Sequence, residues 1–408
     1  MKQYILLIYL TAWTIGSLSA QSLEDYQQLA VEGNPAVRSK YKAFEAAMTR
    51  VQQANSLPDP SLSFGYFISP VETRVGPQRA RFSLSQMFPW FGTLKAQGDV
   101  ASLTAEATYQ QFVEAQNSVR FEVAEAYYPL QELEGLLAVQ VDNLELLKSW
   151  KRLAIVKYEN GETALADVFR IDLLIKELET ELSLIEGRRK PLTIAFNRLL
   201  NRDDEEVIAV AQWKELDASD TPAFVDWSTH PRMLELQKRI AAKQALGKAI
   251  EKQGLPKIGA GLDYVIVGER DDAMVPDNGR NAFMPMVTVS LPIFRKKYSA
   301  AIDEAELQKE AYELDLQSVE NELVAKLEQL RYEIQRETEL SDLYQRQIQD
   351  TEQIQRLLLS GFSNAGSDLD ELLRIQMQQL NYEIKLINAK TRTMTAIANK
   401  RYILGEGI

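Results

Sequence analysis

The sequence predicts an exported, mainly α-helical protein with two structural repeats, in which four strands per chain contribute to a membrane β-barrel. Three features lead to this prediction: an apolar leader, a set of motifs that occurs twice, and four segments with alternating apolar and polar side chains. The chain has 408 residues and an ordinary apolar share, which excludes a disordered or collagen-like protein.

The start of the chain has the pattern of a secretory signal peptide. A basic Lys2 is followed by an apolar stretch from Tyr4 to Ile15, and small residues end at Ala20 before the polar Gln21. We therefore expect residues 1–20 to be removed and the mature chain to begin at Gln21. The alternatives are a buried N-terminal helix and an uncleaved membrane anchor.

Composition excludes several classes of protein. The chain has no cysteine, which excludes disulfides, thiolate metal sites and a lipid-modified N-terminal cysteine. Its net charge of −12 argues against nucleic-acid binding. No later segment offers about twenty uninterrupted apolar residues, so a helical inner-membrane transporter is excluded. We expect no cofactor and no metal site.

Three motifs recur in the same order, which indicates an internal duplication. Residues 57–66 and 255–264 both place Leu-Pro before a short alternating segment, and two further pairs follow, 82–91 with 287–294 and 158–171 with 362–375. Each copy then predicts a helix, two strands, a very long helix and a returning helix. The predicted helices are 34–56, 92–157 and 164–200 in the first copy, and 231–254, 296–360 and 367–402 in the second.

The duplication divides the chain into a first repeat at 21–202, a connector at 203–230, a second repeat at 231–402 and a tail at 403–408. The long helices are coiled-coil-like, with apolar residues such as Leu133, Leu136 and Leu137 at three- and four-residue steps. Pro129 interrupts the first of them. We expect a kink near Tyr128, and the alternative is a helix that ends and restarts there.

The four strand segments alternate as strands of a membrane barrel do. One face is apolar, and the other is predicted to line a water-filled lumen through Ser61, Ser63, Arg79, Arg81, Ser83, Ser85, Lys257, Asp263, Thr288 and Ser290. Alternation alone would favour a half-buried soluble sheet. Export and the number of strands favour the membrane.

Four strands leave two open edges, and open edges cannot face hydrocarbon. Two chains would supply eight strands around a filled interior, whereas three would supply twelve around a lumen. A channel therefore requires at least three protomers. Trp90, Phe91 and Phe294 follow the strands and suit the boundary between lipid and water. The loops 71–78 and 269–280 would face the cell exterior.

These features together resemble the TolC-type outer-membrane efflux proteins over essentially the whole mature chain. The resemblance implies a homotrimer in the outer membrane, with a twelve-stranded β-barrel continued into the periplasm by an α-helical barrel. It also implies a periplasmic adaptor and a proton-driven inner-membrane pump as partners, and a passive duct rather than an enzyme.

In that family the two helical turns lie at the periplasmic end and close the channel. The resemblance therefore assigns Tyr158, Gly161, Phe362 and Gly366 to the tips, and Asp368, Asp370 and Glu371 to an acidic constriction, with Asp167 as the counterpart of Glu371. The alternative for the acids is stabilisation of helix N-termini. Ala365 stands where the commonest tip pattern has glycine.

The run from Phe88 to Gly92 resembles the heavy-metal-exporting branch of the family, which expels copper, silver, zinc or cobalt ions. Other small molecules remain open as the exported compound.

Three other functions are alternatives to a channel: an enzyme, a periplasmic adaptor and a soluble scaffold. An enzyme would need placed acid–base groups, and His230 is the only histidine; we expect it to be solvent-exposed or to cap a helix. A periplasmic adaptor has one helical hairpin, whereas this chain repeats the pattern twice. A soluble coiled-coil scaffold with a minor sheet is the third alternative.

Overall fold

A computed structural model of the chain describes residues 22–211, 213, 225–272, 274–364 and 369–405. The predicted signal peptide and its processing site lie outside these residues, as do the predicted site residues Gly366 and Asp368. The described part is mainly helical, with one four-stranded sheet.

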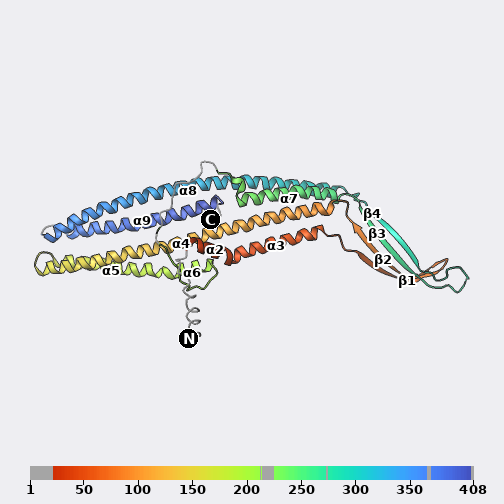
Figure 1. The fold of residues 1–408 in the computed structure, drawn as a ribbon, viewed down its shortest axis with the longest axis horizontal. Coiled ribbons are helices and arrows are strands. Elements are labelled where there is room, and N and C mark those ends of the chain that lie inside the picture. The colour runs from red at the N-terminus through yellow and green to blue at the C-terminus, as the bar shows by residue number, and fades with distance from the viewer. Residues whose placement is uncertain (1–21, 212, 214–224, 273, 365–368, 406–408) are drawn as a thin grey trace, which may run out of the picture. The chain divides into compact units, whose positions relative to one another are not determined.

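The elements follow the predicted duplicated order. The first half contains α2 (Leu23–Gly33), α3 (Pro35–Asn55), β1 (Ser61–Thr73), β2 (Gly76–Phe88), α4 (Thr93–Glu159), α5 (Leu165–Gly187) and α6 (Arg189–Leu199). A short 3₁₀ turn, η1 (Trp227–Thr229), precedes the second half, which contains α7 (Pro231–Gln253), β3 (Lys257–Val267), β4 (Ala282–Ser290), α8 (Lys296–Asn364) and α9 (Leu369–Ile403). Figure 1 shows these elements along the chain.

Three local predictions need correction. The returning helix expected at 164–200 is divided at Arg188 into α5 and α6. The loop expected at 71–78 is mostly strand, because β1 and β2 pair as far as Thr73 and Gly76. The helix α4 runs through Pro129 without interruption, so a helix that ends and restarts there is wrong. The kink near Tyr128 stays a prediction.

The helix α2 was not predicted, although its start has a clear local signal. Ser22 accepts a hydrogen bond from the backbone N–H of Asp25, and the Asp25 carboxylate accepts one from the backbone N–H of Ser22. This reciprocal capping box satisfies two backbone donors that a helix start otherwise leaves without partners. The helix then ends at Gly33, before Asn34 and Pro35.

The sheet belongs to one of two compact units, formed by Lys40–Phe112 and Pro231–Val319. Its strands are all antiparallel in the order β1-β2-β3-β4, so the pairing of β2 with β3 joins the two repeats. Next to it, Tyr41 of α3 packs on Phe112 of α4 with ring centroids 5.2 Å apart. On α7, Lys238 pairs with Glu106 of α4 at 2.7 Å. The part of α4 around residues 106–112 thus contacts both α3 and α7.

The other unit, which includes Val113–His230 and Glu320–Ile408, contains the helical hairpins α4–α5 and α8–α9. In Figure 1 its four long helices lie in the order α8, α9, α4, α5. Their core is apolar and is built by residues at helical spacing from all four, including Leu147, Trp150, Ile171, Ile175, Leu372 and Leu373. Within the described ranges, no helix combines the length and apolar character that crossing a bilayer requires.

Several amides are buried between α4 and α9 in this unit. Gln376 donates from Nε2 to Oδ1 of Asn143 at 2.8 Å and accepts a hydrogen bond from Gln355 of α8. One turn before Asn143, Gln140 is fully buried, and neither polar atom of its amide has a partner among the described residues. A buried polar group without a partner carries its full desolvation cost.

Replacing this amide by a thioether of similar size is therefore expected to stabilise the protein. We predict that Gln140→Met raises the free energy of unfolding by about 1–2 kcal/mol, because desolvation of the amide is removed while the volume is kept. The measurement is the denaturation midpoint of the helical signal in circular dichroism.

Gln131 provides the matched control on the same helix. It is also buried, but its Nε2 donates to the carbonyl of Ala211 at 2.8 Å. Gln131→Met should lower the midpoint, since it leaves that carbonyl without its donor. A Gln140→Met protein that is destabilised as much as Gln131→Met would contradict this account.

Candidate functional site

The register of the sheet sorts its side chains onto two faces. Residues that pair across antiparallel strands project to the same side. One row runs through Ser63, Ser83, Asp263 and Met284, and the next residues along the strands form the row Phe64, Phe82, Tyr264 and Phe283. Alternate rows are thus polar or small on one face and apolar or aromatic on the other.

The predicted lumen residues lie on the polar face, with one exception. Nine of them share that face by register, namely Ser61, Ser63, Arg81, Ser83, Ser85, Lys257, Asp263, Thr288 and Ser290. Arg79 does not, because it occupies an irregularity between the pairs Gln78–Val267 and Ala80–Ile266. An unpaired residue in such a bulge does not follow the alternation of the strand.

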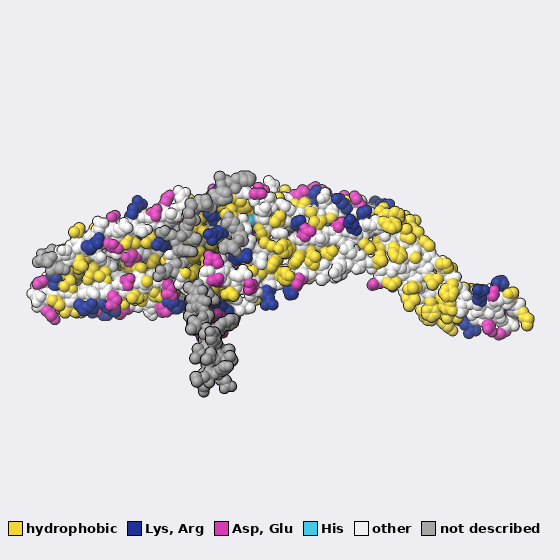
Figure 2. All heavy atoms as spheres, in the orientation of Figure 1, with side chains coloured by type: hydrophobic (Ala, Val, Ile, Leu, Met, Phe, Trp, Pro, Cys, Tyr) yellow, Lys and Arg dark blue, Asp and Glu magenta, His cyan; other side chains and the backbone are white. Residues whose placement is uncertain are grey.

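In the two central strands the polar face is more buried than the apolar face, whereas Ser61 and Ser63 of β1 and Thr288 and Ser290 of β4 are exposed on the polar face. Asp263 is fully buried, whereas Phe64 is 62% exposed and Val287 is 79% exposed. Figure 2 shows the apolar side chains as a continuous surface over the strands. This distribution is the reverse of that in a water-soluble sheet, which would bury its apolar face.

Two contacts on the polar face join neighbouring strands. The Arg81 guanidinium of β2 donates to the Asp263 carboxylate of β3, so the buried carboxylate is paired. The Ser61 and Ser85 hydroxyls lie 2.8 Å apart across β1 and β2. Sequence reasoning had placed these residues on one face, but it had no means of showing that Arg81 and Asp263 meet.

The three predicted interface aromatics are exposed just beyond the strands. Trp90 and Phe91 follow β2, and Phe294 follows β4, with Phe91 and Phe294 each about 80% exposed. Gly92 then turns the chain into α4 with a φ of +78°, a left-handed conformation that favours glycine. The aromatic rings are thereby held at the junction of sheet and helices.

The first hairpin tip ends α4 in a glycine cap. The N–H of Gly161 donates to the carbonyl of Tyr158 at 2.9 Å, and the N–H of Glu162 donates to that of Lys157 at 2.8 Å. These are the two bonds of a Schellman motif, and Gly161 has the required positive φ of +74°. Tyr158 and Gly161 thus lie at the tip, as the family resemblance implied.

Asp167 and the second tip carry most of the predicted acids. The Asp167 carboxylate accepts hydrogen bonds from the Thr163 hydroxyl at 2.6 Å and from the Ala164 N–H at 3.3 Å, which is a helix-capping arrangement. Asp370 and Glu371 occupy the first turn of α9. Asp370 also pairs with Arg170 of α5 at 3.2 Å. One ion pair therefore connects the two hairpins.

Phe362 was expected to shape the tip, and its ring is a core residue. It is 5% exposed and packs in the cluster that contains Leu147, Trp150 and Leu372. The Lys157 ammonium lies 5.2 Å from the centre of its ring, and Lys157 also pairs with Glu162 at 2.9 Å. Phe362 thus anchors the base of the tip through packing and a cation–π contact.

Of the two roles expected for His230, solvent exposure is wrong, whereas the residue does cap a helical segment, the η1 turn. Its side chain is 4% exposed and lies beside Trp227, with ring centroids 6.4 Å apart. Its backbone N–H closes the η1 turn by donating to the carbonyl of Trp227 at 3.0 Å. His230 therefore ends the connector. Among the described residues, no group of three His, Cys, Asp or Glu side chains is arranged to hold a metal ion.

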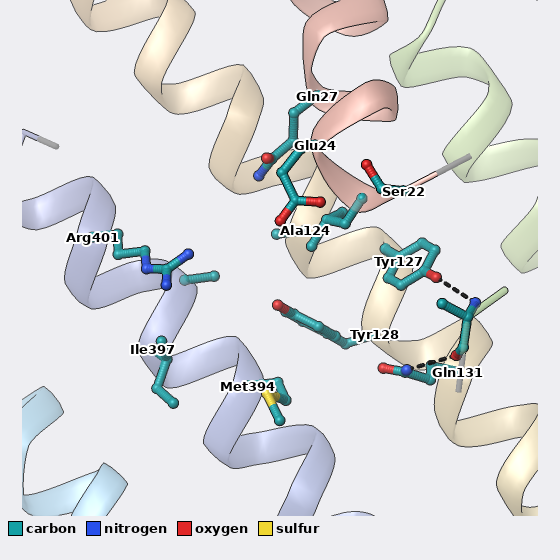
Figure 3. Close-up of a pocket in the computed structure, with 13 residues that line it drawn as sticks. Ser22, Glu24, Gln27, Ala124, Tyr127, Tyr128, Gln131, Met394, Ile397 and Arg401 are labelled. Atoms are coloured by element: carbon teal, nitrogen blue, oxygen red, sulfur yellow. Dashed lines mark hydrogen bonds between the residues drawn. The ribbon is translucent and has the colours of Figure 1, made fainter. Parts of the chain in front are cut away.

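A cavity between α2, α4 and α9 was not anticipated from the sequence. It measures about 280 Å³ and is lined by residues such as Gln27, Tyr127, Tyr128, Met394, Ile397 and Arg401. The Tyr128 ring projects from α4 toward Met394 and Ile397 (Figure 3), and burial raises the pKa of its hydroxyl to about 12. Tyrosines in a helix carried no signal that could have predicted this cavity.

The tyrosines around this cavity hold the connector. Tyr127 accepts a hydrogen bond from the N–H of Ala211 at 2.7 Å, and Tyr26 accepts one from the N–H of Ala209 at 2.8 Å. Gln131 donates to the carbonyl of Ala211. The backbone polar groups of this connector stretch are therefore satisfied by side chains of α2 and α4.

Comparisons with known proteins agree with this geometry. The sequence of residues 228–406 matches the outer membrane efflux protein family. No curated protein shows significant sequence similarity to the chain. Among solved structures, the outer membrane protein VceC of Vibrio cholerae is 17% identical with a TM-score of 0.74, over 94% of this chain and 96% of that one.

Two further channels have the same fold. The open state of the Neisseria gonorrhoeae MtrE outer membrane channel is 16% identical, with a TM-score of 0.76 over 94% of this chain and 89% of that one. The Campylobacter jejuni CmeC outer membrane channel is also 16% identical, with a TM-score of 0.72 over 94% and 85%. At these identities the similarity establishes the fold.

The family model over the second half and the shared fold over nearly all of the described chain confirm the resemblance seen in the sequence. Residues 228–406 of the chain match the outer membrane efflux protein family, and 94% of the chain has the fold of outer-membrane channels such as VceC.

Proposed function

We propose that three copies of this chain form one channel, which conducts substrates passively as the outer component of a tripartite efflux system. The observation that carries the proposal is a sheet with an exposed apolar face, a polar face on the opposite side, and two outer strands whose outer edges have no partner strand among the described residues. An inner-membrane pump and a periplasmic adaptor would supply the substrate and the energy.

The strands favour closure by several chains. β1 and β4 are the edges of the sheet, and the alternating directions make β4 antiparallel to β1. The β4 strand of one protomer can therefore continue the antiparallel ladder on β1 of the next. Three protomers give twelve strands, enough to leave an aqueous lumen, and the ring leaves no edge in the membrane.

The helical hairpins have matching edges. α8 and α5 lie outermost in their unit, and each carries an exposed apolar stripe. On α8, Tyr332, Leu343 and Ile354 recur every eleven residues, and on α5, Leu165, Phe169 and Leu173 recur every four. Both spacings keep side chains on one helix face. Because the two edges differ, we infer that α8 packs on α5 of the neighbouring protomer in a closed ring.

The remaining assignments follow from this arrangement. The repeats at 21–202 and 231–402 would each contribute one strand pair and one hairpin, and the connector at 203–230 would join them. The nine polar-face residues of the sheet would line the lumen with Arg79 at its rim. The tips around Gly161 and Asp370 would meet the adaptor. We propose heavy-metal ions as the substrate, because the residues from Phe88 to Gly92 resemble the heavy-metal-exporting branch of the family.

The first test is the oligomeric state of the protein from purified outer membranes. We predict a detergent-resistant trimer that dissociates on heating, and loss of that trimer in Phe169→Lys or Leu343→Lys. Burying such a side chain is worth about 1.5–3 kcal/mol, and each substitution acts at three interfaces. Gel mobility before and after heating, with light scattering, measures both.

Val141→Lys is the matched control, since Val141 is also exposed but belongs to α4, which lies between α9 and α5. Its trimer should dissociate at the wild-type temperature. A monomer recovered in soluble form from the periplasm would refute the channel and favour the coiled-coil scaffold.

The acids at the tips give the second test. We predict that Asp370→Ala, alone and with Asp368→Ala, raises single-channel conductance in planar bilayers or reduces the preference for cations. The substitution removes a negative charge from each protomer and also the Arg170–Asp370 ion pair between the hairpins.

Asp315→Ala, at an exposed position of α8, is the control for removing a carboxylate far from the tips. It should leave conductance and selectivity unchanged. If Asp370→Ala behaves like Asp315→Ala, the acids only stabilise the helix N-terminus and do not form a constriction.

A further inference from the structure

The ends of the sheet differ in charge. Four segments meet at the helical end, 55–61, 86–98, 245–256 and 290–300. They hold two acidic residues, Asp59 and Glu251, and six basic ones, namely Lys95, Lys248, Lys252, Arg295, Lys296 and Lys297. The opposite end, at 71–79 and 267–281, holds four basic and five acidic residues. A local excess of positive charge stands out in a chain of net charge −12.

Contacts within the sheet unit hold the basic segments together. Arg295 donates from Nη1 to the carbonyl of Gly254 at 2.9 Å, which joins the start of α8 to the end of α7. The Lys252 side chain lies against Gly92, where an added Cβ would be 3.4 Å from Nζ. Residues from after β2, from the end of α7 and from after β4 therefore share one surface, which we call the basic band.

The basic side chains of the band are not neutralised by ion pairs. Among the residues that the structure describes, none of the six forms a salt bridge with a carboxylate. Lys297 instead lies over the ring of Tyr298, with Nζ 4.8 Å from its centre. Like charges gathered without ion-pair partners repel one another, so binding of an anion would stabilise the band.

The apolar surface begins directly beside the basic band. Phe91, Ile293 and Phe294 are all more than 70% exposed, and they separate the band from the open apolar face of the strands. Figure 2 shows the basic side chains gathered where the apolar surface of the sheet starts. A ligand that meets both features has an anionic head next to hydrocarbon.

We propose that the basic band binds the headgroups of anionic phospholipids in the periplasmic leaflet of the outer membrane. This inference rests on the outer-membrane channel described above, with its helices in the periplasm. The exposed aromatic rings fix the depth of the sheet in the bilayer by lying at the boundary between hydrocarbon and water. The lysines contact phosphate oxygens of the headgroups just outside that boundary. The mixed charges at the opposite end of the sheet make no equivalent surface.

The test measures which lipids contact the reconstituted channel. Spin-labelled phosphatidylglycerol and phosphatidylcholine are compared by electron paramagnetic resonance, where protein-contacting lipid gives a motionally restricted signal. We expect wild type to prefer phosphatidylglycerol, with a preference that falls as salt is added. The triple variant K252Q/K296Q/K297Q should lose most of it, by about fivefold for each lysine near the headgroups.

Two further variants separate charge from other effects. K252R/K296R/K297R keeps the charge and should keep the preference. K40Q/K190Q/K326Q removes three lysines from helices outside the band and should behave as wild type. An unchanged preference in K252Q/K296Q/K297Q, or no preference in wild type, overturns the proposal.

The same experiment would give a different result if the protein were not a membrane channel. A reconstituted protein that restricts neither lipid would not be in contact with the bilayer, which would overturn the membrane-channel function and this inference together. Restriction of both lipids to equal extents would overturn only the basic band, because the channel would still be inserted.

Discussion

The absence of water in the membrane interior is the constraint on which this structure depends. Backbone N–H and C=O groups there must be paired within protein, and a four-stranded sheet pairs only its inner strands fully. The edges at β1 and β4 and the open apolar face around Phe64 are therefore incomplete in a single chain. In the proposed trimer, pairing of β4 with β1 of the next protomer would satisfy the backbone groups at the edges, and the hydrocarbon of the bilayer would cover the apolar face.

The same constraint explains the inverted burial of the sheet. On the polar face, the Asp263 carboxylate is paired with Arg81, and the other polar residues would face water in the proposed lumen. A buried carboxylate without such a partner would be strongly unfavourable. At the helical end of the sheet, exposed rings at Phe91 and Phe294 give way to unpaired lysines, which is the order of environments from hydrocarbon to headgroups.

The helical unit solves a different problem, because its long helices pack on each other in water. Apolar residues at helical spacing form its core, while amides at Asn143 and Gln376 are buried between α4 and α9. Exposed stripes remain on α5 and α8, the outermost helices. The turn between α4 and α5 is stabilised by local hydrogen bonds, namely the glycine cap at Gly161 and the capping carboxylate of Asp167.

The local sequence pattern was sufficient to predict the order of elements, the duplication and the two faces of the strands, because each of these depends on the spacing of residues along one segment. It predicted α7, α8 and α9 closely and the face of nine lumen candidates. The local pattern did not predict features that depend on residues distant in the sequence. These are the burial of Phe362 and His230, the Arg81–Asp263 ion pair and the bulge at Arg79. Those outcomes depend on which surfaces meet after folding, and periodicity within one segment carries no record of its partners.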